Sequence, residues 1–328
     1  MTDSSQPKPA KSDVDVSGGR VADATTGNWV DRYAPNWFRP FGQLARFDRP
    51  IGAWLLLFPC WWGQALGEIY AGHSFPNIWY ILLFFVGAFV MRGAGCTYND
   101  IVDRNYDGRV ERTASRPIPS GRVSVAEASA FAGLQCLIGL AVLLHFNWYT
   151  VVLGASSLLL VAAYPFAKRF TFWPQLVLGL TFKWGALVGF TAIVGTMALP
   201  SALLYIGCIL WTIGYDTIYA HQDKEDDALL GLKSTALRFG AATHAWLTGF
   251  YIGAILFWFV ATLQAGAGWL TISALGIVAL HMVWQITTLD TSDGANCLER
   301  FKSNRIIGWI VFIGLLADMI VGQSAGRL

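Results

Sequence analysis

Hydrophobic residues of the chain fall into long apolar runs that are separated by short polar connections. A helix needs about 20 predominantly apolar residues to cross the hydrocarbon core of a membrane. The pattern therefore predicts an all-α membrane protein, a bundle of nine transmembrane helices. The predicted spans are residues 51–71, 78–98, 124–145, 149–166, 173–196, 200–219, 243–263, 268–287 and 306–323. Ser124 and Glu127 match an S-x-x-E capping box, which predicts the start of the third helix.

The first 50 residues differ in character from this transmembrane domain, which we assign to residues 51–328. Residues 1–28 are polar and carry no aromatic side chain, which is typical of a disordered tail. Residues 29–50 mix aromatic residues with arginines and predict an interfacial amphipathic helix. The tail has no apolar core and contains aspartates, so we expect neither a signal peptide nor a transit peptide. A bacterial inner (cytoplasmic) membrane is therefore the expected location.

Lysine and arginine residues are distributed unevenly between the connections. Most of the 23 basic residues lie before residue 51 or in the connections 99–123, 167–172, 220–242 and 288–305. The four connections that alternate with these carry none. By the positive-inside rule, this alternation places the N-terminus and all charged connections in the cytoplasm.

Composition narrows the class of protein further. The chain is 55% hydrophobic and only 13% charged, whereas a typical soluble domain has about 25% charged residues. A net charge of +2 gives no reason to expect a nucleic-acid partner. The 5 cysteines are odd in number and include no CxxC pair, which argues against a disulfide framework and against a zinc site.

A first acidic motif lies in the polar stretch Asn99–Gly121. Asn99, Asp103 and Asp107 are spaced i, i+4 and i+8, and Asp100 shares a face with the same two aspartates. Carboxylates stacked in this way repel one another unless a cation lies between them. Mg²⁺ suits such oxygen ligands, because it is usually held by one or two carboxylates together with substrate phosphates. Taken alone, the motif is also compatible with a solvated charged loop.

A second acidic motif lies at residues 215–240, on the same predicted side of the membrane. Asp216, Asp223 and Asp227 are spaced i, i+7 and i+11, and Tyr219 follows Asp216 at i+3, so a continuous helix would place all four on one face. This motif alone also has a charged-loop interpretation. Together, two acidic motifs at one end of a membrane bundle can hold two Mg²⁺ ions on a diphosphate, and acidic clusters of this kind are functional candidates.

Both motifs resemble those of a known family. The first is similar to the NDxxDxxxD signature of UbiA-type membrane prenyltransferases, and the second resembles their DxxxD motif. The blocks MRGAGCTYNDIVDRNYDGRVERTASRPIPSG, YPFAKRFTFWPQLVLGLTFKWG and YDTIYAHQDKEDDALLGLKSTALRFG resemble the 4-hydroxybenzoate polyprenyltransferase branch in particular, and RFDRPIGAWLLLFP also fits. The resemblance extends from about residue 45 to residue 323.

The resemblance implies nine transmembrane helices around a central cavity that is open laterally to membrane lipid. The implied activity is transfer of an all-trans polyprenyl group from polyprenyl diphosphate to 4-hydroxybenzoate, ortho to the hydroxyl, with release of diphosphate. This reaction requires Mg²⁺ and belongs to ubiquinone biosynthesis. The length of the prenyl donor does not follow from the motifs.

Site residues also follow from the resemblance. Asn99, Asp103 and Asp107 would hold one Mg²⁺, Asp223 and Asp227 the other, and Asp100 would support the first. Further candidates for substrate binding, not all of them from the resemblance, are Arg46, Arg92, Arg116, Tyr164, Lys168, Arg169, Lys183 and Tyr219. Lys168 and Arg169 match the family's basic pair and would contact the diphosphate or the benzoate carboxylate, with positive-inside anchoring as the alternative. Arg112 and Arg116 would assist the diphosphate or lie in an exposed loop.

The chemistry suggests three further roles. An allylic cation must be kept from water, and aromatic faces stabilise cations. Tyr164 and Tyr219 are the candidates, although a tyrosine at helical spacing often serves packing alone. A base near the phenol would make the aromatic ring more nucleophilic, and Asp216 is our candidate for that base.

Two cations fall inside predicted spans. Arg92 precedes Asn99 by seven residues, so it lies on the same face and about 10 Å deeper. We expect Arg92 to face the cavity and to pair with an acid or with the benzoate carboxylate, because an arginine facing lipid is costly. Lys183 matches no signature of the family. Its alternatives are a counter-ion for benzoate and a structural partner of an acid in another helix.

Two other functions compete with this one. Within the same reaction class, the acceptor could be dihydroxynaphthoate or homogentisate. A transporter would also use charges inside the membrane, but transporter sites lie near the midplane, whereas both motifs here lie at one membrane face. Release of diphosphate in the presence of Mg²⁺ separates the enzyme from the transporter.

Overall fold

The structure is a computed structural model that describes residues 21, 24, 27–108, 111–229 and 231–324. Every regular element in this part of the chain is a helix, with no strand, so the all-α prediction is confirmed. The predicted disordered tail, residues 1–28, falls almost entirely outside the described residues.

Eight helical segments of the described chain are long and apolar enough to cross a membrane. They are Ile78–Asp107, Val125–Leu143, Trp148–Phe170, Pro174–Val194, Leu199–Leu229, Thr235–Ala265, Trp269–Thr287 and Gly294–Val321. The ninth predicted span is also a helix, α3 (Ile51–Ala71), but it carries Pro59, Gln64 and Glu68, which lower its hydropathy. The prediction of nine spans therefore exceeds by one the count that length and hydropathy support.

Helix α4 (Ile78–Asp107) runs 30 residues without a break and carries the whole first acidic motif. Asn99, Asp103 and Asp107 therefore do share one helical face, as their spacing predicts. Helix α6 (Val125–Leu143) begins with the predicted capping box, in which Ser124 and Glu127 exchange hydrogen bonds.

Two predicted spans are interrupted. Helix α7 (Trp148–Ala163) continues through the 3₁₀ turn η1 (Tyr164–Phe166) into α8 (Ala167–Phe170). The predicted span 173–196 is two helices, α9 (Pro174–Phe182) and α10 (Gly185–Val194). The predicted span 200–219 is the single helix α11 (Leu199–Ala220), which ends before the second acidic motif is complete.

Beyond α11 the second motif continues through η2 (His221–Asp223) and α12 (Lys224–Leu229). The continuous helical face predicted for the motif is therefore wrong beyond Ala220. The remaining elements are α5 (Glu111–Ala114), α13 (Thr235–Phe239), η3 (Gly240–Ala242), α14 (Thr243–Ala265), α15 (Trp269–Thr287) and α16 (Gly294–Ser324). The last helix thus begins 12 residues before the predicted residue 306.

The predicted amphipathic helix at residues 29–50 is two short helices instead, α1 (Trp29–Tyr33) and α2 (Arg39–Leu44). The break falls at Ala34, which is extended, because a residue that precedes proline disfavours the helical conformation. The chain then turns at Arg46, whose φ of 59° is the one positive value among the described non-glycine residues.

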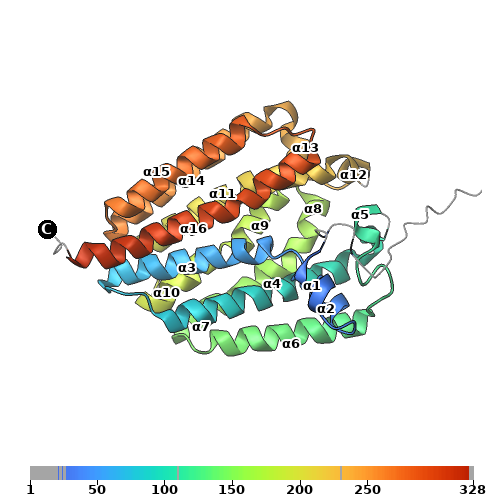
Figure 1. The fold of residues 1–328 in the computed structure, drawn as a ribbon, viewed down its shortest axis with the longest axis horizontal. Helices are drawn as coiled ribbons and strands as arrows, with labels where there is room; N and C mark the ends of the chain where they lie inside the picture. Colours follow the sequence, from blue (N-terminus) through green and yellow to red (C-terminus); the bar gives the residue numbers. More distant parts are fainter. Residues whose placement is uncertain (1–20, 22–23, 25–26, 109–110, 230, 325–328) are drawn as a thin grey trace, which may run out of the picture.

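The long helices pack side by side, and the short helices α5, α8, α12 and α13 gather at one end of the bundle (Figure 1). An aromatic cluster fills the centre, where Trp62 stacks on Trp211 at 5.2 Å and meets Trp258 edge-on at 5.1 Å. Helices α3 and α10 approach closely, since a Cβ added at Gly189 would clash with the backbone of Cys60. This rigid core carries both acidic motifs to the end where the short helices lie.

Candidate active site

Residues of both acidic motifs line one polar pocket of about 280 Å³. The last turns of α4 contribute one set, and the end of α11 with η2 and α12 contributes the other. The acidic and amide groups that line it are Asn99, Asp103, Asp107, Gln175, Asp216, Asp223, Asp226 and Asp227. The structure thus brings together two motifs that lie more than a hundred residues apart in the sequence.

Basic side chains neutralise the first motif. Asp103, which is 1% exposed, accepts from Lys168 Nζ at 2.8 Å and from Arg169 Nη2 at 3.0 Å. Asp107 accepts from Arg116 Nη1 at 2.9 Å. These charge-assisted hydrogen bonds explain how a buried row of aspartates is tolerated in one helix.

Asp100 shares the face of α4 with Asp103 and Asp107 but does not line the polar pocket. Its carboxylate accepts two hydrogen bonds from Arg46 Nη2, at 2.7 and 2.9 Å. Arg116 Nη1 lies 3.4 Å from the same carboxylate. Arg116 thus contacts both Asp100 and Asp107, and the part of Asp100 in metal binding stays a prediction.

A second and larger cavity of about 1230 Å³ adjoins the polar pocket. Its walls are mainly apolar side chains of α3, α4, α6, α7, α9 and α10. The residues that line both cavities are Asn99, Arg116, Tyr164, Pro165, Asp216 and Tyr219. A charged group in the polar pocket would therefore lie directly beside the mouth of the apolar cavity.

Two tyrosines stand at this junction. Tyr164 lies in η1, and its ring is 6.3 Å from the ring of Phe182. Tyr219 lies in the last turn of α11 and packs on Phe301 at 4.6 Å. Both line the two cavities, so each side chain is available to a bound molecule as well as to packing.

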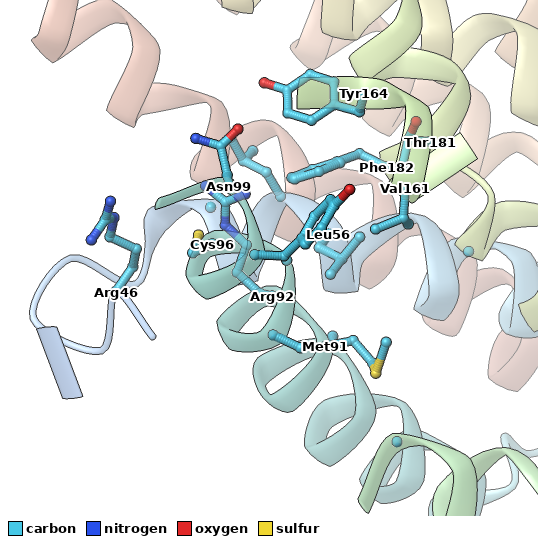
Figure 2. Close-up of a pocket in the computed structure, with 18 of the residues that line it drawn as sticks. Arg46, Leu56, Met91, Arg92, Cys96, Asn99, Val161, Tyr164, Thr181 and Phe182 are labelled. Atoms are coloured by element: carbon cyan, nitrogen blue, oxygen red, sulfur yellow. The ribbon is translucent and has the colours of Figure 1, made fainter. Parts of the chain in front are cut away.

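Arg92 faces the apolar cavity, as predicted (Figure 2). Its guanidinium carbon lies 4.9 Å from the centre of the Phe182 ring. A Cβ at Gly52 would come within 2.6 Å of Arg92 Nε, so the glycine leaves room for the guanidinium. Nε is buried and has no hydrogen-bond partner, and the described residues form no ion pair with this arginine. The predicted acidic partner is therefore absent from the described part of the chain.

Lys183 neither lines a cavity nor pairs with an acid among the described residues. Its side chain is fully buried, and Nζ donates to the carbonyl oxygen of Leu55 at 2.7 Å. These contacts support neither alternative predicted for Lys183, a benzoate counter-ion or a partner of an acid. The break between α9 and α10 directs this side chain away from the cavity and into the packed core.

Two further basic residues, Arg112 and Lys233, lie close to the acidic motifs in the sequence. The side chain of Arg112 lies outside the described part of the molecule. Lys233 lines the polar pocket and was not predicted. Its backbone amide donates to the carbonyl oxygen of Lys168 at 2.9 Å, which joins the loop after α12 to α8. The only sequence signal was its position just after the second motif.

The polar pocket suits Mg²⁺ in the chemistry of its donors, which are carboxylate and amide oxygens. Within the described residues, no three His, Cys, Asp or Glu side chains lie close enough together to enclose an ion. Mg²⁺ usually keeps several water ligands and takes one or two carboxylates together with substrate phosphates. The arrangement therefore fits an ion that enters with a phosphorylated substrate.

The chain is similar to known proteins over most of its length. The model of the UbiA prenyltransferase family matches residues 56–315. The chain is 49% identical over 319 residues to the mitochondrial 4-hydroxybenzoate polyprenyltransferase of Arabidopsis thaliana, covering 97% of this chain and 76% of that protein. It is 46% identical over 313 residues to the mitochondrial 4-hydroxybenzoate polyprenyltransferase of Homo sapiens, covering 94% and 81%.

Solved structures show the same fold. A UbiA homolog from Aeropyrum pernix K1 has a TM-score of 0.69 at 26% identity, covering 80% of this chain and 98% of that one. A UbiA homolog from Archaeoglobus fulgidus bound to DMAPP and Mg²⁺ has a TM-score of 0.64 at 17% identity, covering 86% and 99%. Both curated relatives are mitochondrial, which gives no support to the predicted bacterial inner membrane.

Proposed function

The chain belongs to the UbiA prenyltransferase family, and we propose that it transfers a polyprenyl group from polyprenyl diphosphate to 4-hydroxybenzoate, ortho to the hydroxyl. The observation that carries this proposal is the junction of a polar, acid-lined pocket with a large apolar cavity. A polyprenyl diphosphate has a charged head and a long apolar tail, so the two cavities match its two parts. This transfer is a step in ubiquinone biosynthesis.

The head group is assigned to the polar pocket. Mg²⁺ would be held by Asn99, Asp103, Asp107, Asp223 and Asp227. When bound, it supplies positive charge that stabilises the departing diphosphate. Arg116, Lys168 and Arg169 donate to aspartates in the structure. We assign these three side chains to the diphosphate oxygens once the aspartates have a metal to bind.

The tail and the allylic cation are assigned to the apolar cavity. Cleavage of the bond between carbon and the diphosphate oxygen leaves a cation that water would destroy. The apolar walls exclude water from it, and aromatic faces stabilise a cation at short range. Tyr164 and Tyr219 lie where the head meets the tail, so we assign them to the cation.

The acceptor is assigned to the wall that Arg92 and Asp216 share. The guanidinium of Arg92 lines the apolar cavity and forms no ion pair with the described residues. It suits the carboxylate of 4-hydroxybenzoate, because charge-assisted hydrogen bonds to a carboxylate are strong. Asp216 would receive the phenol proton, which raises the electron density of the ring. The ring carbon beside the hydroxyl then bonds to the allylic carbon and loses its hydrogen as a proton to the departing diphosphate, and Asp216 returns its proton to the phenolate oxygen. Arg46, which is bound to Asp100 at the cavity, is kept as a substrate-binding candidate.

The orientation in the membrane is also a proposal. The basic connections and the polar pocket lie at the same end of the bundle, and the positive-inside rule assigns that end to the cytoplasmic side or its organellar equivalent. The other expected partner is membrane lipid, which the exposed apolar residues of the spans would contact.

The decisive experiment supplies purified protein with Mg²⁺, labelled polyprenyl diphosphate and one acceptor at a time. We expect prenylated 4-hydroxybenzoate and equimolar diphosphate. Asp103→Ala and Asp223→Ala should abolish both products. Product formation only with dihydroxynaphthoate or homogentisate would replace the acceptor in this proposal. Absence of diphosphate release with every donor and acceptor would favour a transporter.

A further inference from the structure

Lys183 occupies an unusual place for a charged side chain. It lies within the span Pro174–Val194 and is fully buried. Its Nζ is 2.7 Å from the carbonyl oxygen of Leu55, in α3. The same atom lies 4.5 Å from the ring centre of Trp211 and 5.2 Å from that of Tyr215, both in α11. One ammonium group therefore contacts two other helices.

The Leu55 carbonyl is free to accept this hydrogen bond because of a proline. In an α-helix, the carbonyl of residue 55 would accept from the amide of residue 59. Residue 59 is Pro59, inside α3, and proline has no amide hydrogen to donate. A carbonyl left without a donor in a membrane interior is costly. Lys183 supplies the missing donor from a residue 128 positions away.

The backbone around Lys183 connects this contact to the cavity. Lys183 ends α9, with φ −95° and ψ 0°, and α10 begins at Gly185. Its neighbours Phe182 and Trp184 line the apolar cavity, as do Leu55 and Tyr215, which its ammonium contacts, whereas Lys183 itself does not. Phe182 lies beneath the guanidinium of Arg92, so the break that Lys183 holds also sets the place of the ring that supports Arg92.

We propose that Lys183 is a positioning residue for the aromatic acceptor. Its ammonium replaces the amide that Pro59 lacks and ties α3, α11 and the break between α9 and α10 together behind the cavity wall. This fixes Phe182 against Arg92 and so fixes the group that receives the acceptor carboxylate. The acceptor part of this inference rests on the proposed function, whereas the coupling between Lys183 and Pro59 does not.

Three variants test the coupling: Lys183→Met, Pro59→Ala and the double variant. Lys183→Met leaves the Leu55 carbonyl without a donor. Pro59→Ala restores a backbone amide at the helical position, so it should repair that loss. We expect Lys183→Met to lower the Tm of the purified protein in detergent and Pro59→Ala to recover most of it in the double variant. Pro59→Ala alone should change Tm little, because the carbonyl already has a donor.

Kinetics test the positioning role. Lys183→Met should raise the KM for 4-hydroxybenzoate on the order of tenfold, as expected for one mispositioned buried hydrogen-bonding group. The KM for polyprenyl diphosphate should stay within about twofold. The double variant should recover the acceptor KM. Pro200→Ala is the matched control, since Pro200 is in the first turn of α11, where the missing amide leaves no helical carbonyl without a donor. It should rescue nothing.

Several outcomes would overturn the proposal. One is a double variant no more stable than Lys183→Met. Another is an equal rise in the KM of both substrates. If Lys183→Met gives no folded protein, the double variant must restore folding, and failure to do so counts against the coupling. A wild-type protein that turns over no acceptor would refute the proposed function, but the Tm comparison would still decide the link between Lys183 and Pro59.

Discussion

Arg46 binds Asp100 across 54 residues of sequence, through both carboxylate oxygens, at 2.7 and 2.9 Å. The arginine has a φ of 59°, a conformation that costs free energy for any residue with a Cβ. Asp100 is completely buried. The contact therefore joins the turn after α2 to α4, the helix that carries the first acidic motif. The carboxylate of Asp100 is thereby paired with an arginine in the absence of a metal.

The first prediction separates Asp100 from the metal ligands. Asp100→Asn removes the charge that Arg46 and Arg116 face, and breaking a buried ion pair costs about 3–5 kcal/mol. We expect a clearly lower Tm, with the Mg²⁺ concentration for half-maximal activity unchanged within about twofold. Asp103→Asn should instead raise that Mg²⁺ requirement strongly. Equal Mg²⁺ shifts in the two variants would show that Asp100 is a ligand.

The second prediction concerns Arg92. Arg92→Met removes the cation assigned to the acceptor carboxylate, which should raise the KM for 4-hydroxybenzoate by on the order of a hundredfold. The KM for the prenyl donor should change little. Phe182→Leu keeps the guanidinium but removes the ring 4.9 Å away, so its effect should be about tenfold or less.

A phenol without a carboxylate supplies the control for Arg92. The wild type should prefer 4-hydroxybenzoate to this phenol, and Arg92→Met should lose that preference. The assignment fails if the variant discriminates between the two acceptors as well as the wild type does.

Local spacing predicted the first half of the site well. Asn99, Asp103 and Asp107 share a face because α4 continues unbroken to Asp107, and the i, i+4, i+8 pattern requires only that one helix persist. The second motif follows a different path, because α11 ends at Ala220 and Asp223 lies in a 3₁₀ turn. Neither glycine nor proline marks that end in the sequence, so helical spacing could not reveal it.

Long-range partners were beyond the reach of sequence patterns. The donor to the Leu55 carbonyl is Lys183, 128 residues away, and nothing local to either residue identifies the other. Pro59 was visible in the sequence, but a proline shows only that a carbonyl loses its helical donor, not which side chain replaces it. The run 51–71 was also predicted as a span, although Gln64 and Glu68, which are almost fully buried, lower the hydropathy of α3.

The third prediction follows from the ion pairs of Asp103. Mg²⁺ at this carboxylate competes with the positive charges of Lys168 and Arg169, which diphosphate would neutralise. Mg²⁺ and diphosphate should therefore bind cooperatively, each lowering the Kd of the other. Calorimetric titration of inorganic diphosphate with and without Mg²⁺ measures this coupling without any turnover.

Lys168→Gln should change the binding of Mg²⁺ and the binding of diphosphate in opposite directions. Removing one competitor for Asp103 should tighten binding of Mg²⁺ alone, and removing one cation should weaken binding of diphosphate alone. Arg305→Gln, which removes an exposed cation that lines neither cavity, should change neither. Weaker binding of Mg²⁺ alone to Lys168→Gln would contradict the proposed competition.

The last prediction concerns the path of the prenyl tail. Gly133 lines the apolar cavity from α6, and a Cβ added there meets no atom within 4 Å. Gly133→Phe should therefore fold and occupy space that a long tail needs. Turnover with long polyprenyl diphosphates should fall by on the order of tenfold, as for overpacking of an apolar site, while turnover with a short donor such as geranyl diphosphate should fall little.

Gly276, in α15 and away from both cavities, also has open space around an added Cβ, so Gly276→Phe is the matched control and should change turnover with neither donor. An equal loss with short and long donors in Gly133→Phe would show that the tail does not pass this point, because only a blocked tail path makes the effect depend on donor length.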